Sequence, residues 1–137
     1  MPQWLPAPAP ERTPETEPFW SATRDGRLLL QHCGACGTVA WFPRAVCLAC
    51  QSTDLEWRPA SGRGTVYSFT VVHQGLGAYR DVVPFVVGYV ELEEGPRVLT
   101  NIVGCEPGAV HIGQTVVVQF DDTGDGSALY RFRPLEP

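Results

Sequence analysis

Two Cys-x-x-Cys pairs separated by ten residues constrain this chain more than any other feature of its sequence. Residues 33–50 read CGACGTVAWFPRAVCLAC, which supplies four thiols: Cys33, Cys36, Cys47 and Cys50. Each pair can hold a metal from one tight turn, and Gly34 and Gly37 allow the backbone to fold around the first. Four thiolates in a tetrahedron form a closed structural site with no open position for water. The spacing therefore predicts a structural Zn²⁺ ion.

Three other states of these cysteines remain open on the sequence. Iron accepts four thiolates in the same geometry, so a rubredoxin-like electron carrier is the main competitor. A disulfide and an empty site are the other two. Visible absorption distinguishes ferric thiolate from colourless zinc.

Composition restricts the class of partner and the compartment. The chain has 137 residues, a net charge of −5 and ten basic residues that are all Arg, with no basic cluster. Nucleic-acid binding needs a basic face, so such a partner is not expected. The first residues lack the pattern of a signal peptide, and no run is long and apolar enough to span a membrane. We expect a cytoplasmic protein without a membrane partner.

The N-terminal part divides into a leader and a helix. Residues 1–15 are Pro-rich and predict an extended segment. Residues 16–26 predict a short helix, in which Thr16 is the N-cap and Gly26 ends the helix. Phe19 and Trp20 would anchor it by burial.

The remaining sequence is mainly β and predicts two modules. Residues 27–60 hold the cysteines and three short strand patterns (27–32, 39–42 and 55–60), which together predict a rubredoxin-like zinc ribbon. Residues 61–137 contain five β-rich runs separated by Gly, Pro and Asp clusters: 64–73, 83–92, 97–103, 115–122 and 129–134. This pattern predicts a five-stranded OB-fold barrel, with a five-stranded open sandwich as the alternative.

Few other residues suggest chemistry. Arg63, in the turn SGRG, could hold a phosphate or form a structural ion pair, and the loop 74–83 with Tyr79 and Arg80 could meet a ligand or be a solvated connection. Cys105 is more simply a buried small hydrophobe than a nucleophile. No catalytic site is assembled, so no activity is expected from the chain alone.

In this order the segments resemble a known family, formerly classed as a domain of unknown function, in which a rubredoxin-like zinc ribbon precedes an OB-fold. The resemblance runs from about Thr16 to Pro134. It is carried by PFWSATRDG, LLLQHCGACG, CLACQSTDLEW, SGRGTVYSFTVVH, PFVVGYVELEEGPRVLTNIVG, IGQTVVV and FRP.

The resemblance implies an accessory, non-catalytic subunit that stabilises a thiolase-fold enzyme acting on acyl-CoA. Such partners include lipid-transfer-type thiolases and the retro-aldolases of steroid side-chain degradation. It also implies that the ribbon and the N-terminal helix dock the partner and that the barrel shapes an acyl-CoA channel. Large aromatic residues near the ribbon are the candidate interface anchors: Phe19, Trp20, Trp41, Phe42 and Trp57. Arg63, Tyr79 and Arg80 are the candidate acyl-CoA contacts.

A different hypothesis is an OB-fold that binds single-stranded nucleic acid on stacking aromatics. Four side chains have the right chemistry: Tyr67, Phe69, Phe85 and Tyr89. The acidic charge balance argues against this hypothesis.

Overall fold

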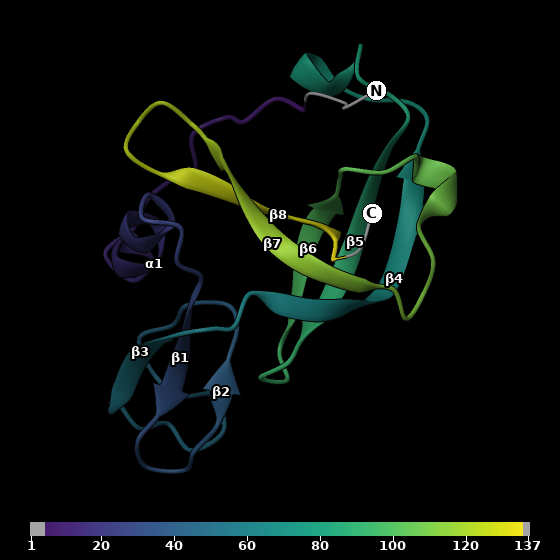
Figure 1. The fold of residues 1–137 in the computed structure, drawn as a ribbon. Helices are drawn as coiled ribbons and strands as arrows, with labels where there is room; N and C mark the ends of the chain where they lie inside the picture. Colours follow the sequence, from purple (N-terminus) through teal and green to yellow (C-terminus); the bar gives the residue numbers. More distant parts are fainter. Residues whose placement is uncertain (1–4, 136–137) are drawn as a thin grey trace.

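A short helix, a three-stranded sheet and a closed barrel follow one another along the chain (Figure 1). The computed structural model describes residues 5–135. Helix α1 spans Glu17–Thr23, and the small sheet consists of β1 (Leu29–Cys33), β2 (Val39–Ala40) and β3 (Leu55–Pro59). The barrel consists of β4 (Arg63–Val72), β5 (Phe85–Leu92), β6 (Arg97–Ile102), β7 (Thr115–Asp122) and β8 (Ala128–Pro134), with 3-10 turns at Gly77–Tyr79 and Pro107–Ala109.

Both sheets contain the strands that the sequence predicts, three in the ribbon and five in the barrel. In the ribbon, β1 lies between β2 and β3 and is antiparallel to both. The barrel closes in the order β4-β5-β6-β8-β7, and β7 pairs back onto β4. Closure confirms the OB-fold and rules out the open sandwich.

Two glycines allow the strands of the barrel to approach closely. A Cβ at Gly64 would lie 2.5 Å from the carbonyl oxygen of Glu91, and one at Gly88 would lie 2.8 Å from that of Ser68. Pairing between β4 and β5 also shifts register between Val66 and Ser68. Glycines and bulges at such positions let a small sheet bend enough to close.

An aromatic cluster joins the helix, the ribbon and the barrel. The ring of Phe19 lies 4.9 Å from the ring of Trp41 and 5.8 Å from that of Tyr130, in edge-on arrangements. The rings of Trp41 and Tyr130 are also in contact, at 5.6 Å. Burial raises the pKa of Tyr130 to about 12. Since these rings come from α1, the ribbon and β8, the cluster fixes the two modules relative to each other.

The ends of helix α1 agree in part with the sequence. Thr16 is the N-cap residue, but its hydroxyl accepts a hydrogen bond from the N–H of Thr13 (2.9 Å) and makes none to the helix. At the other end the N–H of Gly26 bonds the carbonyl of Thr23 (3.0 Å), with Gly26 at φ +73°. The helix ends at Thr23, and a left-handed glycine then turns the chain.

The leader lies against the barrel. Its described part runs from α1 across the barrel end, towards the loop that follows β4 (Figure 1). The guanidinium of Arg131, which is buried, donates hydrogen bonds to the carbonyls of Leu5 (3.4 Å) and Pro6 and forms an ion pair with Asp121 (2.6 Å). The hydroxyl of Tyr79 also donates to the carbonyl of Pro6 (3.3 Å). Residues 5–13 form no helix or strand and are attached to the barrel by these contacts, whereas residues 1–4 of the predicted leader lie outside the described part of the chain.

Candidate functional site

The four cysteines lie on two turns that share one backbone pattern. In the first, the N–H of Gly37 bonds the carbonyl of Cys33 (2.9 Å), and in the second the N–H of Gln51 bonds that of Cys47 (2.7 Å). Gly37 has φ +78° and Gln51 has φ +65°. The second turn therefore places a non-glycine residue in the left-handed region, which the sequence did not reveal.

The four sulfur atoms form a compact cluster that suits a metal ion. All four lie within 4.8 Å of one another, with Cys33 and Cys50 at 3.6 Å and Cys36 and Cys47 at 3.7 Å. A zinc ion with bonds of about 2.3 Å in a regular tetrahedron places its sulfur ligands about 3.8 Å apart. The four cysteines are therefore positioned to bind a metal ion, and their geometry suits zinc and iron equally.

The protonation of these thiols depends on their neighbours. The hydroxyl of Thr38, 3.0 Å from the sulfur of Cys36, lowers the pKa of that thiol to about 6. The backbone N–H of Ser52 lowers the pKa of Cys50, but the sulfurs of Cys33 and Cys36 raise it, with a net value of about 12. One thiolate is therefore available near neutral pH, while a cation is needed to ionise the whole set.

The candidate acyl-CoA contacts lie at opposite ends of β4. Arg63 begins this strand and is exposed in a cleft that also contains Glu91 and Glu93. Tyr79 and Arg80 lie in the loop beyond its other end. Tyr79 is half-buried against Phe85, at 5.4 Å between rings, and Arg80 is exposed. The structure therefore does not gather these three residues into one site.

An apolar groove lies beside Tyr79 on the outside of the barrel. It has a volume of about 330 Å³ and is lined by Tyr79, Phe85, Val87, Leu99, Thr100 and Asn101. The groove has the chemistry to accept an apolar group.

The candidate interface aromatics differ widely in exposure. Phe19 and Trp20 are buried in the core, and Trp41 and Trp57 are half-buried against it. Phe42 is the one exposed member of this set. As the chain stands, Phe42 can touch a partner directly, while the other four support the surface from beneath.

The aromatics of the nucleic-acid hypothesis are split in the same way. Tyr67 and Tyr89 are exposed, whereas Phe69 is half-buried and Phe85 is buried. Two of the four are therefore on the surface for stacking. The guanidinium of Arg97 already covers the ring of Tyr67, at 3.8 Å from its centroid.

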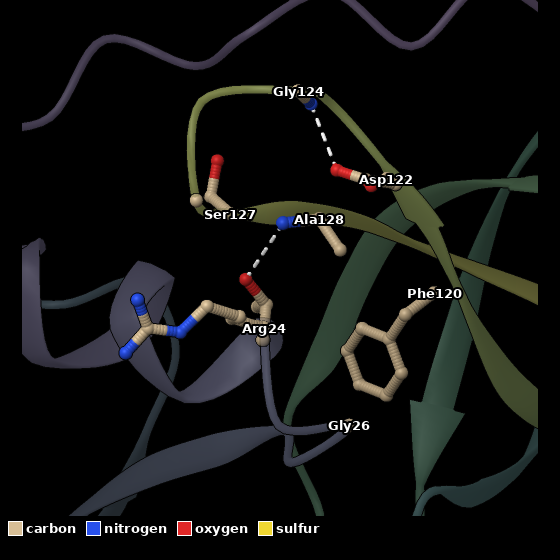
Figure 2. A pocket seen from close by; sticks show the side chains of 9 residues that line it. Arg24, Gly26, Phe120, Asp122, Gly124, Ser127 and Ala128 are labelled. Carbon is tan, nitrogen blue, oxygen red and sulfur yellow. Dashed lines mark hydrogen bonds between the residues drawn. The ribbon is translucent and has the colours of Figure 1, made fainter.

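A second cavity, of about 400 Å³, lies between the end of α1 and the β7–β8 hairpin. Figure 2 shows the ring of Phe120 on one side and the guanidinium of Arg24 directed away from it. The carboxylate of Asp122 accepts a hydrogen bond from the N–H of Gly124 (2.8 Å), which stabilises the β7–β8 turn. The N–H of Ala128 donates to the hydroxyl of Thr23 (3.0 Å). These polar groups hold the hairpin on the helix and assemble no catalytic pair.

Cys105 packs against the core, and burial raises the pKa of its thiol. This environment agrees with a small hydrophobic role. The sequence does not single out Arg131, because two of its three partners, Leu5 and Pro6, lie about 125 positions earlier in the chain.

A four-cysteine ribbon followed by a closed five-stranded barrel defines a zinc-ribbon and OB-fold protein. Family models agree: "ChsH2, rubredoxin-like zinc ribbon domain" matches residues 20–56, and "ChsH2, C-terminal OB-fold domain" matches residues 57–121. A solved structure titled "Ltp2-ChsH2(DUF35) aldolase" superposes with a TM-score of 0.83 at 35% identity, covering 92% of this chain and 98% of that one. The chain belongs to the ChsH2-type DUF35 family.

Three relatives show the range of this family. A "Probable enoyl-CoA hydratase alpha subunit" of Thermomonospora curvata is 38% identical over 87% of this chain, which spans 37% of that protein. A "DUF35 domain-containing scaffold protein" of Methanocaldococcus jannaschii is 38% identical, with 76% of this chain and 79% of that protein covered. "Benzoylsuccinyl-CoA thiolase subunit BbsA" of Thauera aromatica is 29% identical, with 98% and 100% covered. Relatives of this chain are therefore scaffolds or subunits of larger enzymes.

None of the helices in residues 5–135 is long and apolar enough to cross a membrane.

Proposed function

We propose that this chain is an accessory, non-catalytic subunit that binds and stabilises a thiolase-fold enzyme acting on acyl-CoA. One observation carries the proposal: its cysteines, ribbon and barrel belong to a family whose named members are scaffolds and thiolase, hydratase or aldolase subunits. The likeness to the Ltp2-ChsH2 aldolase favours an aldolase as the partner. Retro-aldol cleavage of a steroid side chain, which the family resemblance implies, is the reaction that we propose for it.

In this proposal the metal is zinc, held by Cys33, Cys36, Cys47 and Cys50. Its role is to order a ribbon whose small strands bury little apolar surface on their own. Free, metal-binding thiols need reducing conditions, so we place the complex in the cytoplasm. Metal analysis of the purified protein distinguishes zinc from iron.

The same proposal assigns the partner contact to the ribbon, through Phe42 with Trp41 beneath it, and the acyl-CoA contact to the barrel. Tyr79 borders the apolar groove, which supports an acyl path there. Arg80 is exposed and carries the positive charge that binds a phosphate, whereas Arg63 shares its cleft with two acids and is the weaker candidate.

Purification of the tagged chain from its native host at endogenous level tests the proposal. A thiolase-fold protein should co-purify in stoichiometric amount, and the pair should act on acyl-CoA where the chain alone does not. Recovery of nucleic acid at low salt in place of such a protein would refute it. If Arg80→Ala left the KM of the complex unchanged, that residue would lose its assigned contact.

A further inference from the structure

The exposed apolar side chains of this protein are not scattered. Eight large hydrophobic residues are exposed in the part of the chain that the structure describes: Phe42, Val46, Leu48, Tyr67, Leu76, Tyr89, Leu99 and Ile112. Three of them lie in residues 42–48, which lead into the second cysteine turn, and three lie on the outer face of the barrel. Only Leu76 and Ile112 stand alone, each in a loop. Grouped exposed apolar residues indicate an interaction surface, whereas single ones are normal.

The barrel group forms a row across three adjacent strands. Tyr89 on β5 pairs with Leu99 on β6 and, on its other side, with Ser68 on β4. Tyr67 adjoins Ser68 at the shift in register and is also exposed. Side chains paired across neighbouring strands lie on one face, so we call Tyr67, Tyr89 and Leu99 the barrel row.

The turn group lies on the ribbon, and a groove connects it to the barrel row. Phe42, Val46 and Leu48 form what we call the ribbon tip. The β5–β6 turn reaches down beside β2 (Figure 1), and the groove between them has a volume of about 410 Å³, with Leu48 on the ribbon wall and Pro96 and Arg97 on the barrel wall. Arg97 also lies over Tyr67. The ribbon tip and the barrel row are therefore parts of one surface.

The charge of this groove is opposite to that of the whole chain. Its lining contains Arg44 and Arg97 and no acidic residue, although the chain carries a net charge of −5. Arg97 pairs with Glu91 (3.0 Å). The backbone of Arg44 is held at both its N–H (2.8 Å) and its carbonyl (2.9 Å) by the buried side chain of Gln31. The Arg44 guanidinium, by contrast, has no hydrogen bond or ion pair within residues 5–135.

We propose that the ribbon tip, the groove and the barrel row form a single docking face for the thiolase-fold partner, which inserts a carboxylate towards Arg44. This inference rests on the proposed function and specifies its interface. This surface carries Phe42, Tyr67 and Tyr89 together with Arg44, and aromatic residues and Arg are the types enriched at the binding centre of a protein interface. The aromatic cluster around Phe19 holds ribbon and barrel together, so the two halves of the face are pre-arranged for one rigid partner.

Matched single substitutions test the face. Leu48 and Ile112 are equally exposed, at 69%, but only Leu48 lies on the face. The partner recovered with the wild-type chain is identified, expressed separately and titrated against each variant by calorimetry. Leu48→Asp and Leu99→Asp should each weaken binding by at least about tenfold, and Ile112→Asp by less than about twofold. All three should keep the wild-type melting temperature, because the substituted side chains are exposed.

The charge contact has its own pair of variants. Arg44→Glu should weaken binding at least about tenfold, with a loss that shrinks in high salt, whereas Arg27→Glu, exposed but outside the groove, should not. Equal behaviour of these two variants would overturn the assigned carboxylate contact.

The outcomes separate this inference from the function on which it rests. If no thiolase-fold protein binds the wild-type chain, the proposed function fails. If one binds and Leu48→Asp and Leu99→Asp bind as tightly as Ile112→Asp, the function stands and the face is wrong. If only one of the variants Leu48→Asp and Leu99→Asp loses affinity for the partner, a docking face that spans both modules is refuted. Self-association of the wild-type chain that Leu99→Asp abolishes would assign the barrel row to a second copy of the chain.

Discussion

The contact between Arg131 and the leader gives the sharpest prediction for stability. The side chain of Arg131 is 2% exposed, and its guanidinium pairs with Asp121 at 2.6 Å and donates to the carbonyls of Leu5 and Pro6. Arg131→Met keeps most of the volume of the side chain while it removes every donor. The carboxylate of Asp121 then keeps only the Gln119 amide as a donor, and the carbonyl of Pro6 keeps only the Tyr79 hydroxyl. The carbonyl of Leu5 loses its side-chain donor.

The expected loss of unfolding free energy in Arg131→Met depends on how far water solvates the groups that Arg131 contacted. Breaking a buried ion pair by removing one partner costs about 3–5 kcal/mol. Asp121 is 32% exposed, so water partly solvates it in the variant and the cost falls to about 2–3 kcal/mol. For a chain of this size that loss lowers the melting temperature by about 10 °C.

Urea unfolding of the zinc-loaded protein measures the free energy of unfolding of Arg131→Met, Asp121→Asn and the double variant. The two single changes should not add, with a coupling of about 1–2 kcal/mol. Trypsin should also cut faster after Arg12 in Arg131→Met, since the leader has lost its main attachment. A coupling below about 0.5 kcal/mol, with the leader as protected as in wild type, would show that Arg131 does not hold these elements together.

Three further predictions concern the metal site. Cys47→Ser should reduce bound zinc to well below one equivalent and unfold the ribbon, as metal analysis and circular dichroism would report, while Cys105→Ser should retain the full equivalent. Gln51→Gly should raise the free energy of unfolding by about 0.5–1 kcal/mol, because Gln51 has φ +65°, a conformation that glycine adopts without strain. The control Ala49→Gly, at an exposed position without positive φ, should not raise the free energy of unfolding. Zinc binding should release protons, and the affinity for zinc should fall as the pH falls, with a further loss below about pH 6, where the Cys36 thiolate protonates. Competition with a chromogenic chelator from pH 8 to pH 5 measures this affinity. A pH-independent affinity would contradict the prediction.

The fold could be predicted largely from local signals. The cysteine spacing marks the ribbon, and turn residues delimit each strand of the barrel to within two residues, as at β5, which begins at Phe85 where the pattern predicts Val83. These signals are short-range, so the sequence displays them directly. The predicted extent of the helix, 16–26, is too long, because α1 ends at Thr23 and the turn at Gly26 lies three positions beyond that end.

The surfaces could not be predicted in the same way. Phe19, Trp20 and Phe42 have similar apolar character in the sequence, yet the first two are buried and the third is exposed. Which aromatic residue is covered depends on how the ribbon packs on the barrel, and that packing joins positions as distant as Phe19 and Tyr130. The barrel row likewise depends on the pairing of β5 with β6 and on the irregularity at Tyr67.

The way the two modules are joined explains why a metal is useful in a chain that already has a barrel core. The strands of the ribbon are short: β2 has two residues, and β1 and β3 have five each. Strands of this length bury too little apolar surface to order the ribbon alone. In the proposed function four sulfur–metal bonds supply that order, and the contact of Trp41 with Phe19 and Tyr130 transmits it to the barrel. Loss of the metal should therefore weaken partner binding even where the barrel stays folded, because the ribbon tip would no longer hold its place beside the barrel row.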